Sequence, residues 1–137
     1  MKALVVMLAA LTLFAARAEA AEPVTQTFGV PVDRAWNVTR AVLKQLGWDI
    51  DKEDRSIGWI TTDSRRVEGE DYGVYAKGTR HRLRIEMKAV DNGRTAVTVE
   101  RTVFERERIL FIDNDKPVTV KDQEVEKGVL AAIGRSL

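Results

Sequence analysis

The chain has 137 residues, of which 45% are hydrophobic and 31% charged, a composition typical of a folded globular domain. Its 22 basic and 21 acidic side chains give a formal net charge of +1, which disfavours a nucleic-acid partner. The absence of cysteine excludes disulfide and thiolate chemistry, and a single histidine leaves little material for a catalytic triad or a histidine-rich metal site. We therefore expect one non-enzymatic domain with no cofactor and no metal.

The N-terminus has the pattern of a secretory signal peptide. Lys2 supplies a positive charge, and the apolar run of residues 3–16 is shorter than the ~20 residues that a membrane-spanning helix needs. Ala18-Glu19-Ala20 supplies the small residues of a cleavage site, with a cut after Ala18 as the alternative to one after Ala20. We expect residues 1–20 to be a signal peptide and residues 21–137 to form one periplasmic domain that is neither lipidated nor membrane-spanning.

The first elements are a short strand and a helix. Residues 25–30 are rich in β-formers, and residues 33–46 then place apolar side chains at the spacing of an amphipathic helix. Asp33 is the expected N-cap of this helix. Gly47 is expected to end it in the left-handed conformation, so that Trp48 packs back on the last turn.

A hairpin and a long connection are expected next. Residues 48–51 and 58–62 predict two paired strands, whereas residues 63–79 contain several glycines and little apolar content, which predicts a long loop. Long loops in compact domains are often functional. Because tyrosine is enriched at protein interfaces, Tyr72 and Tyr75 are candidate partner-binding residues.

The clearest strands follow this connection. Residues 80–90 and 95–104 alternate apolar and polar side chains, which is typical of an antiparallel pair with one buried face. The intervening Asp91-Asn92-Gly93 predicts a tight turn, because the Asn-Gly pair tolerates the positive φ angles of a tight hairpin. Arg101 falls in phase with the apolar side chains, so we expect either a bulge near it or the end of the sheet.

The last third of the chain predicts a turn and a helix. Residues 109–112 (ILFI) are expected to be a buried edge strand, with an exposed apolar ridge as the alternative. Residues 113–117 predict a turn, and Thr119 with Asp122 resembles a capping box that opens a helix running to the C-terminus. The elements together predict an α+β fold: an antiparallel β-sheet meander packed on a long C-terminal helix, with a second helix after the first strand.

Two further groups of residues are candidate binding sites. Arg82 and Arg84 lie on the outward face of the strand over residues 80–90, where they form either an ordinary solvated face or a patch for an acidic protein surface or anionic headgroups. A sheet that grips a helix can also enclose an apolar cavity, although a filled core is the ordinary role of its side chains. The candidate lining residues are Trp36, Trp48, Trp59, Ile85 and Met87. His81 is expected to have a structural or surface role.

Several of these segments resemble one family of envelope proteins. They are Ala35-Trp36 with the apolar face of its helix, Gly47-Trp48-Asp49-Ile50, Gly58-Trp59-Ile60-Thr61-Thr62, and Arg82-Leu83-Arg84-Ile85 with its hairpin. Over roughly residues 25–137 the chain is similar to the helix-grip domains of the BamC (lipoprotein-34) family, which are periplasm-facing accessory lipoproteins of the outer-membrane β-barrel assembly machinery. The chain differs in having no lipobox cysteine and a single such domain, so the resemblance implies a helix-grip-like, non-lipidated, single-domain member.

These observations favour a binding protein over an enzyme. We expect a non-enzymatic periplasmic adaptor or accessory protein that binds other cell-envelope proteins. The resemblance adds a link to outer-membrane assembly and a peripheral association with the outer membrane. The alternative function is a carrier that holds a lipid or another small apolar ligand in a cavity between the sheet and the C-terminal helix.

Overall fold

The computed structural model describes residues 22–137, so the expected signal peptide, residues 1–20, lies outside the described residues. It confirms the α+β architecture, an antiparallel sheet packed on two helices. The elements in chain order are β1 (Val24–Phe28), α1 (Val32–Gln45), β2 (Ile50–Asp54), β3 (Trp59–Thr62), β4 (Arg65–Asp71), β5 (Tyr75–Asp91), β6 (Arg94–Ile109), β7 (Ile112–Pro117) and α2 (Glu124–Ser136).

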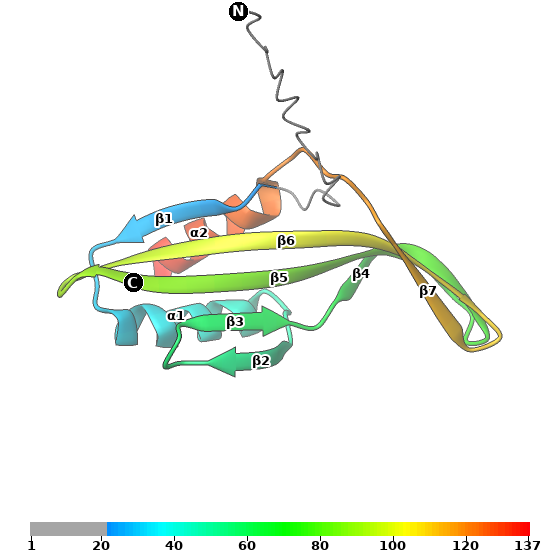
Figure 1. The fold of residues 1–137 in the computed structure, drawn as a ribbon, viewed down its shortest axis with the longest axis horizontal. Coiled ribbons are helices and arrows are strands. Elements are labelled where there is room, and N and C mark those ends of the chain that lie inside the picture. Colours follow the sequence, from blue (N-terminus) through cyan, green and yellow to red (C-terminus); the bar gives the residue numbers. More distant parts are fainter. Residues whose placement is uncertain (1–21) are drawn as a thin grey trace, which may run out of the picture.

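The sheet has two parts that share the long hairpin β5–β6 (Figure 1). In the body, the strand order is β1-β6-β5-β3-β2, and α1 and α2 both pack on one face of these strands. In the arm, which comprises residues 65–80 and 105–117, β4 pairs with β5 and β7 pairs with β6. The arm is therefore a four-stranded extension of the sheet that projects beyond the helices.

The core lies between the body sheet and the helices. Alternate side chains of β5 and β6 turn toward the helices because successive residues of a strand point to opposite faces. They meet the apolar faces of α1 and α2, and the cluster includes Leu83, Ile85, Val97, Val99, Leu43 and Ile133, all of them fully buried. This packing confirms the amphipathic pattern of both helices and the two long strands.

The C-terminal end of α1 forms as predicted. Gly47 has a φ of +85°, its N–H donates to the Lys44 carbonyl at 3.1 Å, and the Trp48 N–H donates to the Leu43 carbonyl at 2.8 Å. This is a Schellman motif, in which a left-handed glycine lets the next residue fold back on the helix. It buries the Trp48 side chain in the core.

The helix N-termini differ from the sequence predictions. Asp33 lies inside α1, whose N-cap position is Pro31 without a side-chain cap, and it pairs with Arg55 at 3.1 Å. The prediction that Thr119 opens the C-terminal helix with a capping box is wrong, since α2 begins at Glu124. Residues 118–123 instead connect the arm to the body, and the Asp122 carboxylate accepts a hydrogen bond from the Glu124 N–H at 3.3 Å.

Arg101 neither ends the sheet nor lies at a bulge. The β5–β6 pairing passes through it without a shift, and its side chain points into the body at 2% exposure. There Nε lies 2.8 Å from Oε1 of Glu126, a fully buried residue of α2, and Nη2 donates to the Asp122 carbonyl at 2.9 Å. The arginine keeps its place in the apolar pattern because α2 supplies a carboxylate directly opposite it.

The expected long loop over residues 63–79 is wrong, and so is the expected turn over residues 113–117. Residues 65–71 form β4, residues 75–79 extend β5, and residues 112–117 form β7. No residue of 65–79 or 105–117 is buried. Because neither helix covers this part of the sheet, both of its faces are polar, and the alternation that marks a half-buried strand is missing.

Candidate docking site at the tip of the arm

The arm is held together by backbone pairing and cross-strand ion pairs rather than by a core. Arg106 contacts Asp115 with two hydrogen bonds of 2.8 and 3.1 Å, and Arg108 contacts Asp113 at 2.8 Å. The hydrogen bond from Arg106 holds the pKa of Asp115 below its usual range. At about 3.3 Å per residue, the strand from Leu83 to Tyr75 carries the end of the arm roughly 25 Å beyond the core.

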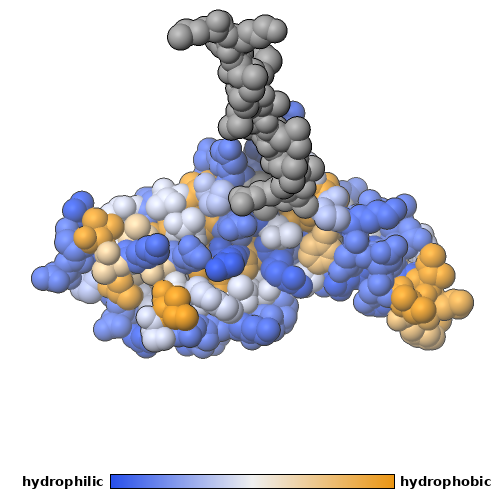
Figure 2. Space-filling model, viewed as in Figure 1, coloured by the Kyte–Doolittle hydropathy of each residue, from blue (hydrophilic) through white to orange (hydrophobic). Residues whose placement is uncertain are grey.

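Exposed apolar side chains gather at the end of the arm, where the β4–β5 and β6–β7 turns lie side by side. The Phe111 N–H at one turn points to the Val74 carbonyl at the other, at 3.5 Å. We call this cluster the apolar tip; it appears as the orange group at the right-hand end of Figure 2. Its members are Tyr72, Val74, Tyr75, Ile109, Leu110, Phe111 and Ile112, each at least 41% exposed. Contiguous exposed apolar patches of this kind mark interaction sites.

The turn at the centre of the apolar tip is unusual. Leu110 and Phe111 have φ angles of +50° and +68°, and they are 75% and 74% exposed. A two-residue turn with both φ angles positive normally uses Asn-Gly, because side chains with a Cβ are strained there. The only Asn-Gly pair of the chain, Asn92-Gly93, forms the predicted turn of β5–β6 without positive φ angles. Leucine and phenylalanine at the tip therefore bring neither burial nor a favourable turn conformation to folding.

The two faces of the arm carry opposite charge. On the face that continues the core side of the sheet, which we call the glutamate face, four glutamates lie with two lysines; these are Glu68, Glu70, Glu105, Glu107, Lys77 and Lys116. On the arginine face, four arginines lie with three aspartates; these are Arg66, Arg80, Arg106, Arg108, Asp71, Asp113 and Asp115. Arg80 is half-buried there, and burial together with the neighbouring Arg106 and Arg66 lowers its pKa.

The structure separates the four candidate partner-binding residues into two groups. Tyr72 and Tyr75 lie in the apolar tip, and the hydrogen bond from the Tyr72 hydroxyl to Glu70, 2.7 Å long, raises the pKa of that tyrosine. Arg82 and Arg84 lie on the outward face of the body strands, away from the tip. Arg82 lies over the Phe104 ring, and Arg84 pairs with Glu86 at 3.1 Å, so these arginines are not part of one surface with the tyrosines.

The candidate cavity residues also divide. Trp36, Trp48, Ile85 and Met87 are buried members of the core cluster and pack against other core side chains. Trp59 does not face the helices: it pairs with Glu86 on the outward face of the sheet, with Arg84 5.9 Å above its ring. The prediction that Trp59 lines a space between the sheet and α2 is therefore wrong, because Ile60 is the residue of β3 that points into the core and Trp59 points to the opposite face.

Two titratable groups inside the body, His81 and Glu126, have shifted pKa values. Burial, reinforced by the positive charge of Arg101, lowers the pKa of His81. Burial raises the pKa of Glu126, and Arg101 offsets part of that effect. Within residues 22–137, no group of three or more side chains is arranged to hold a metal ion, and no helix is long and apolar enough to cross a membrane.

The expected burial of residues 109–112 as an edge strand is wrong, and the alternative, an exposed apolar ridge, is the arrangement observed. The signal was present, since this apolar run lies between alternating charges at 105–108 and polar residues at 113–116. Two charged strands on either side of a short apolar run place that run at a turn, where nothing buries it.

Comparison with protein-family models finds no match, and comparison with curated proteins finds no similar sequence.

Proposed function

We propose that this protein is a non-enzymatic adaptor of the cell envelope that docks on a partner protein through the apolar tip of its arm. The observation that carries the proposal is the conformation of Leu110 and Phe111, which hold left-handed backbone angles while three quarters of each side chain is in solvent. Strained residues that do not contribute to folding are typical of functional sites. Large exposed apolar and aromatic side chains are the usual anchors of a protein interface.

The expected export signal and the resemblance to the helix-grip domains of the BamC family support an envelope partner linked to outer-membrane assembly. In this proposal the body is a rigid base, and the arm carries the contact surface away from it. A partner at the outer membrane would give the adaptor a peripheral association with that membrane, without a spanning segment of its own.

Site-specific photo-crosslinking in the native cells tests the proposal. A photoreactive phenylalanine analogue replaces Phe111 in one variant and Ile57 in a matched control, because Ile57 is also apolar and 68% exposed but lies on the body. We expect discrete protein adducts from position 111 and none from position 57. Adducts only with lipid, or the same adducts from both positions, would contradict the proposal.

A further inference from the structure

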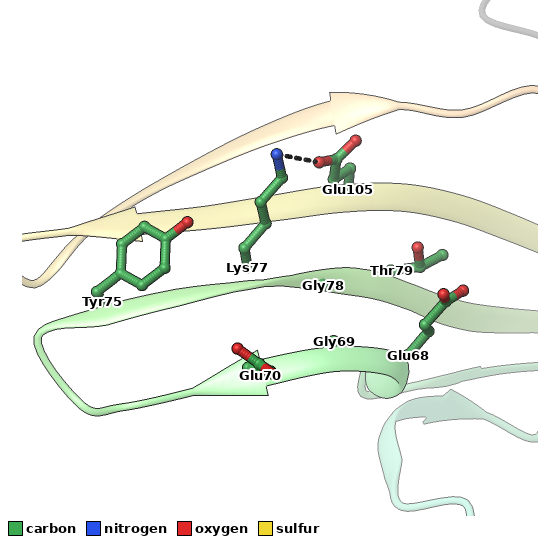
Figure 3. Close-up of a pocket in the computed structure, with 8 residues that line it drawn as sticks. All are labelled: Glu68, Gly69, Glu70, Tyr75, Lys77, Gly78, Thr79 and Glu105. Carbon is green, nitrogen blue, oxygen red and sulfur yellow. Dashed lines mark ion pairs between the residues drawn. The ribbon is translucent and has the colours of Figure 1, made fainter.

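The glutamate face contains a hollow of about 580 Å³ between the body and the apolar tip (Figure 3). Its floor is the backbone of a cross-strand glycine pair, Gly69 and Gly78. A Cβ at Gly78 would lie 2.3 Å from the Glu68 carbonyl oxygen, and one at Gly69 would lie 2.1 Å from the Lys77 carbonyl oxygen. Both positions therefore require glycine, and the strands approach each other closely where the hollow forms.

The hollow continues toward the tip along the same face. A smaller one of about 120 Å³ is lined by Glu105, Glu107 and Lys116 among others. A third, of about 310 Å³, is lined by apolar tip residues, including Ile109 and Leu110. The same face of the arm thus offers depressions from the glycine pair to the tip, and a partner that covers the tip can extend along them.

The charged side chains of the glutamate face indicate which kind of partner segment this surface can bind. Among residues 22–137, Glu68, Glu70 and Glu107 have no ion-pair partner, and Lys77 contacts Glu105 at 3.5 Å. The charged residues next to the tip are four carboxylates and two cations; they are Glu70, Asp71, Glu107, Asp113, Lys77 and Arg108. An acidic surround of this kind repels anionic headgroups and attracts lysine and arginine side chains.

We propose that the adaptor binds an extended basic segment of its protein partner. Apolar side chains of the segment cover the apolar tip, and its lysine or arginine side chains lie over the hollow above the glycine pair, between Glu68, Glu70 and Glu105. This inference rests on the proposed function and specifies the partner for it. The arginine face is left free by this arrangement.

Two synthetic peptides test the inference on the full chain labelled with ¹⁵N. One alternates leucine with lysine, and the other replaces each lysine by glutamate. We expect the lysine peptide to shift the amide resonances of residues 68–70, 75–79 and 105–112, with an affinity that falls as salt is added. Equal binding of the two peptides, or shifts confined to the arginine face, would overturn the inference.

The matched variants are Glu68→Gln/Glu70→Gln on the glutamate face and Glu86→Gln/Glu100→Gln on the outward face of the body. Glutamine at position 70 can still accept a hydrogen bond from the Tyr72 hydroxyl, so the substitution removes the charge and keeps this contact. We expect the first pair of substitutions to weaken the binding of the lysine peptide about fivefold, which corresponds to the loss of two exposed ion pairs. The second pair should leave the affinity unchanged. If the two pairs of variants bind the lysine peptide equally, the basic-segment inference is overturned. The proposed function is tested separately, and it fails if position 111 gives no protein adducts on crosslinking.

A membrane is the competing occupant of the apolar tip. Co-sedimentation with phosphatidylcholine vesicles, with and without phosphatidylglycerol, distinguishes it. We expect no binding to either vesicle. Binding that disappears in a Leu110→Asn/Phe111→Gly variant would assign the tip to a lipid surface and overturn the inference.

Discussion

β5 and β6 run through both the body and the arm, but their surroundings change at about Arg80 and Phe104. In the body, one face of the hairpin is packed against α1 and α2, and the other is solvated. In the arm, both faces meet solvent, and ion pairs such as Arg106–Asp115 take the place of apolar packing. Exposed ion pairs contribute little each, so the arm should be the less stable of the two regions.

Two turns sharpen this comparison. The β5–β6 turn at the body end uses Asn92-Gly93, residues suited to turns, and keeps ordinary backbone angles. The β6–β7 turn at the tip uses Leu110-Phe111 in the left-handed region that favours Asn-Gly. The body turn follows the requirements of folding, while the tip turn departs from them, and this difference supports the proposal that the tip contacts another molecule.

The largest effect is expected from breaking the body. Arg101→Ala leaves the Glu126 carboxylate buried without its nearest cation, which should cost about 3–5 kcal/mol in the free energy of unfolding. Urea denaturation measures this loss. The double variant Arg101→Met/Glu126→Leu removes both charges and should recover most of it, so a double variant as unstable as the single one would contradict this account.

A smaller effect, confined to the arm, is expected from Gly78→Ala. The new Cβ clashes with the Glu68 carbonyl oxygen, and overpacking of this kind costs about 1–3 kcal/mol. Hydrogen exchange should then show lost protection in β4 and retained protection in the body strands. Gly128→Ala in α2 is the matched control, because nothing lies within 4 Å of its Cβ position. Loss of protection throughout the body would show that the two regions unfold together.

Leu110→Asn/Phe111→Gly should separate folding from binding. It relieves the left-handed strain at the tip turn, which should stabilise the arm by about 1–2 kcal/mol. The same change removes the central anchors and should abolish the protein contacts of the tip. Hydrogen exchange of β7 measures the first effect, and crosslinking from a photoreactive residue at Tyr75 measures the second. A variant that is both less stable and fully able to bind would refute the comparison of the two turns.

The smallest effect concerns pH and belongs to the body. Burial lowers the pKa of His81 in the folded state, so the unfolded chain takes up its proton first as the pH falls. Stability should therefore decline from about pH 6.5, the ordinary pKa of histidine, down to the lowered value in the folded protein. His81→Asn should flatten this decline in thermal unfolding measured across that range; an unchanged slope would assign it to other groups.

Much of the body could be predicted from the sequence. The periodicity of α1, the glycine after it and the alternation in β5 and β6 were correctly interpreted, because each reflects burial of one face or a local backbone requirement. The arm could not be predicted in the same way. Its strands have no buried face, so their sequence resembles that of a loop, and the apolar run at residues 109–112 resembled a buried strand although it is exposed.

By itself, the sequence determined the fold class, the helix faces and the turn at Asn92-Gly93, since these depend on interactions between residues close along the chain. Only the tertiary structure decided what lies opposite what: Glu126 against Arg101, Gly69 against Gly78, and Phe111 beside Val74. Each pair joins residues of different strands, turns or helices, and the pattern within one element does not encode which residue of another element lies against it. The candidate docking site depends on such pairs, because it exists only where two turns and four strands meet beyond the reach of either helix.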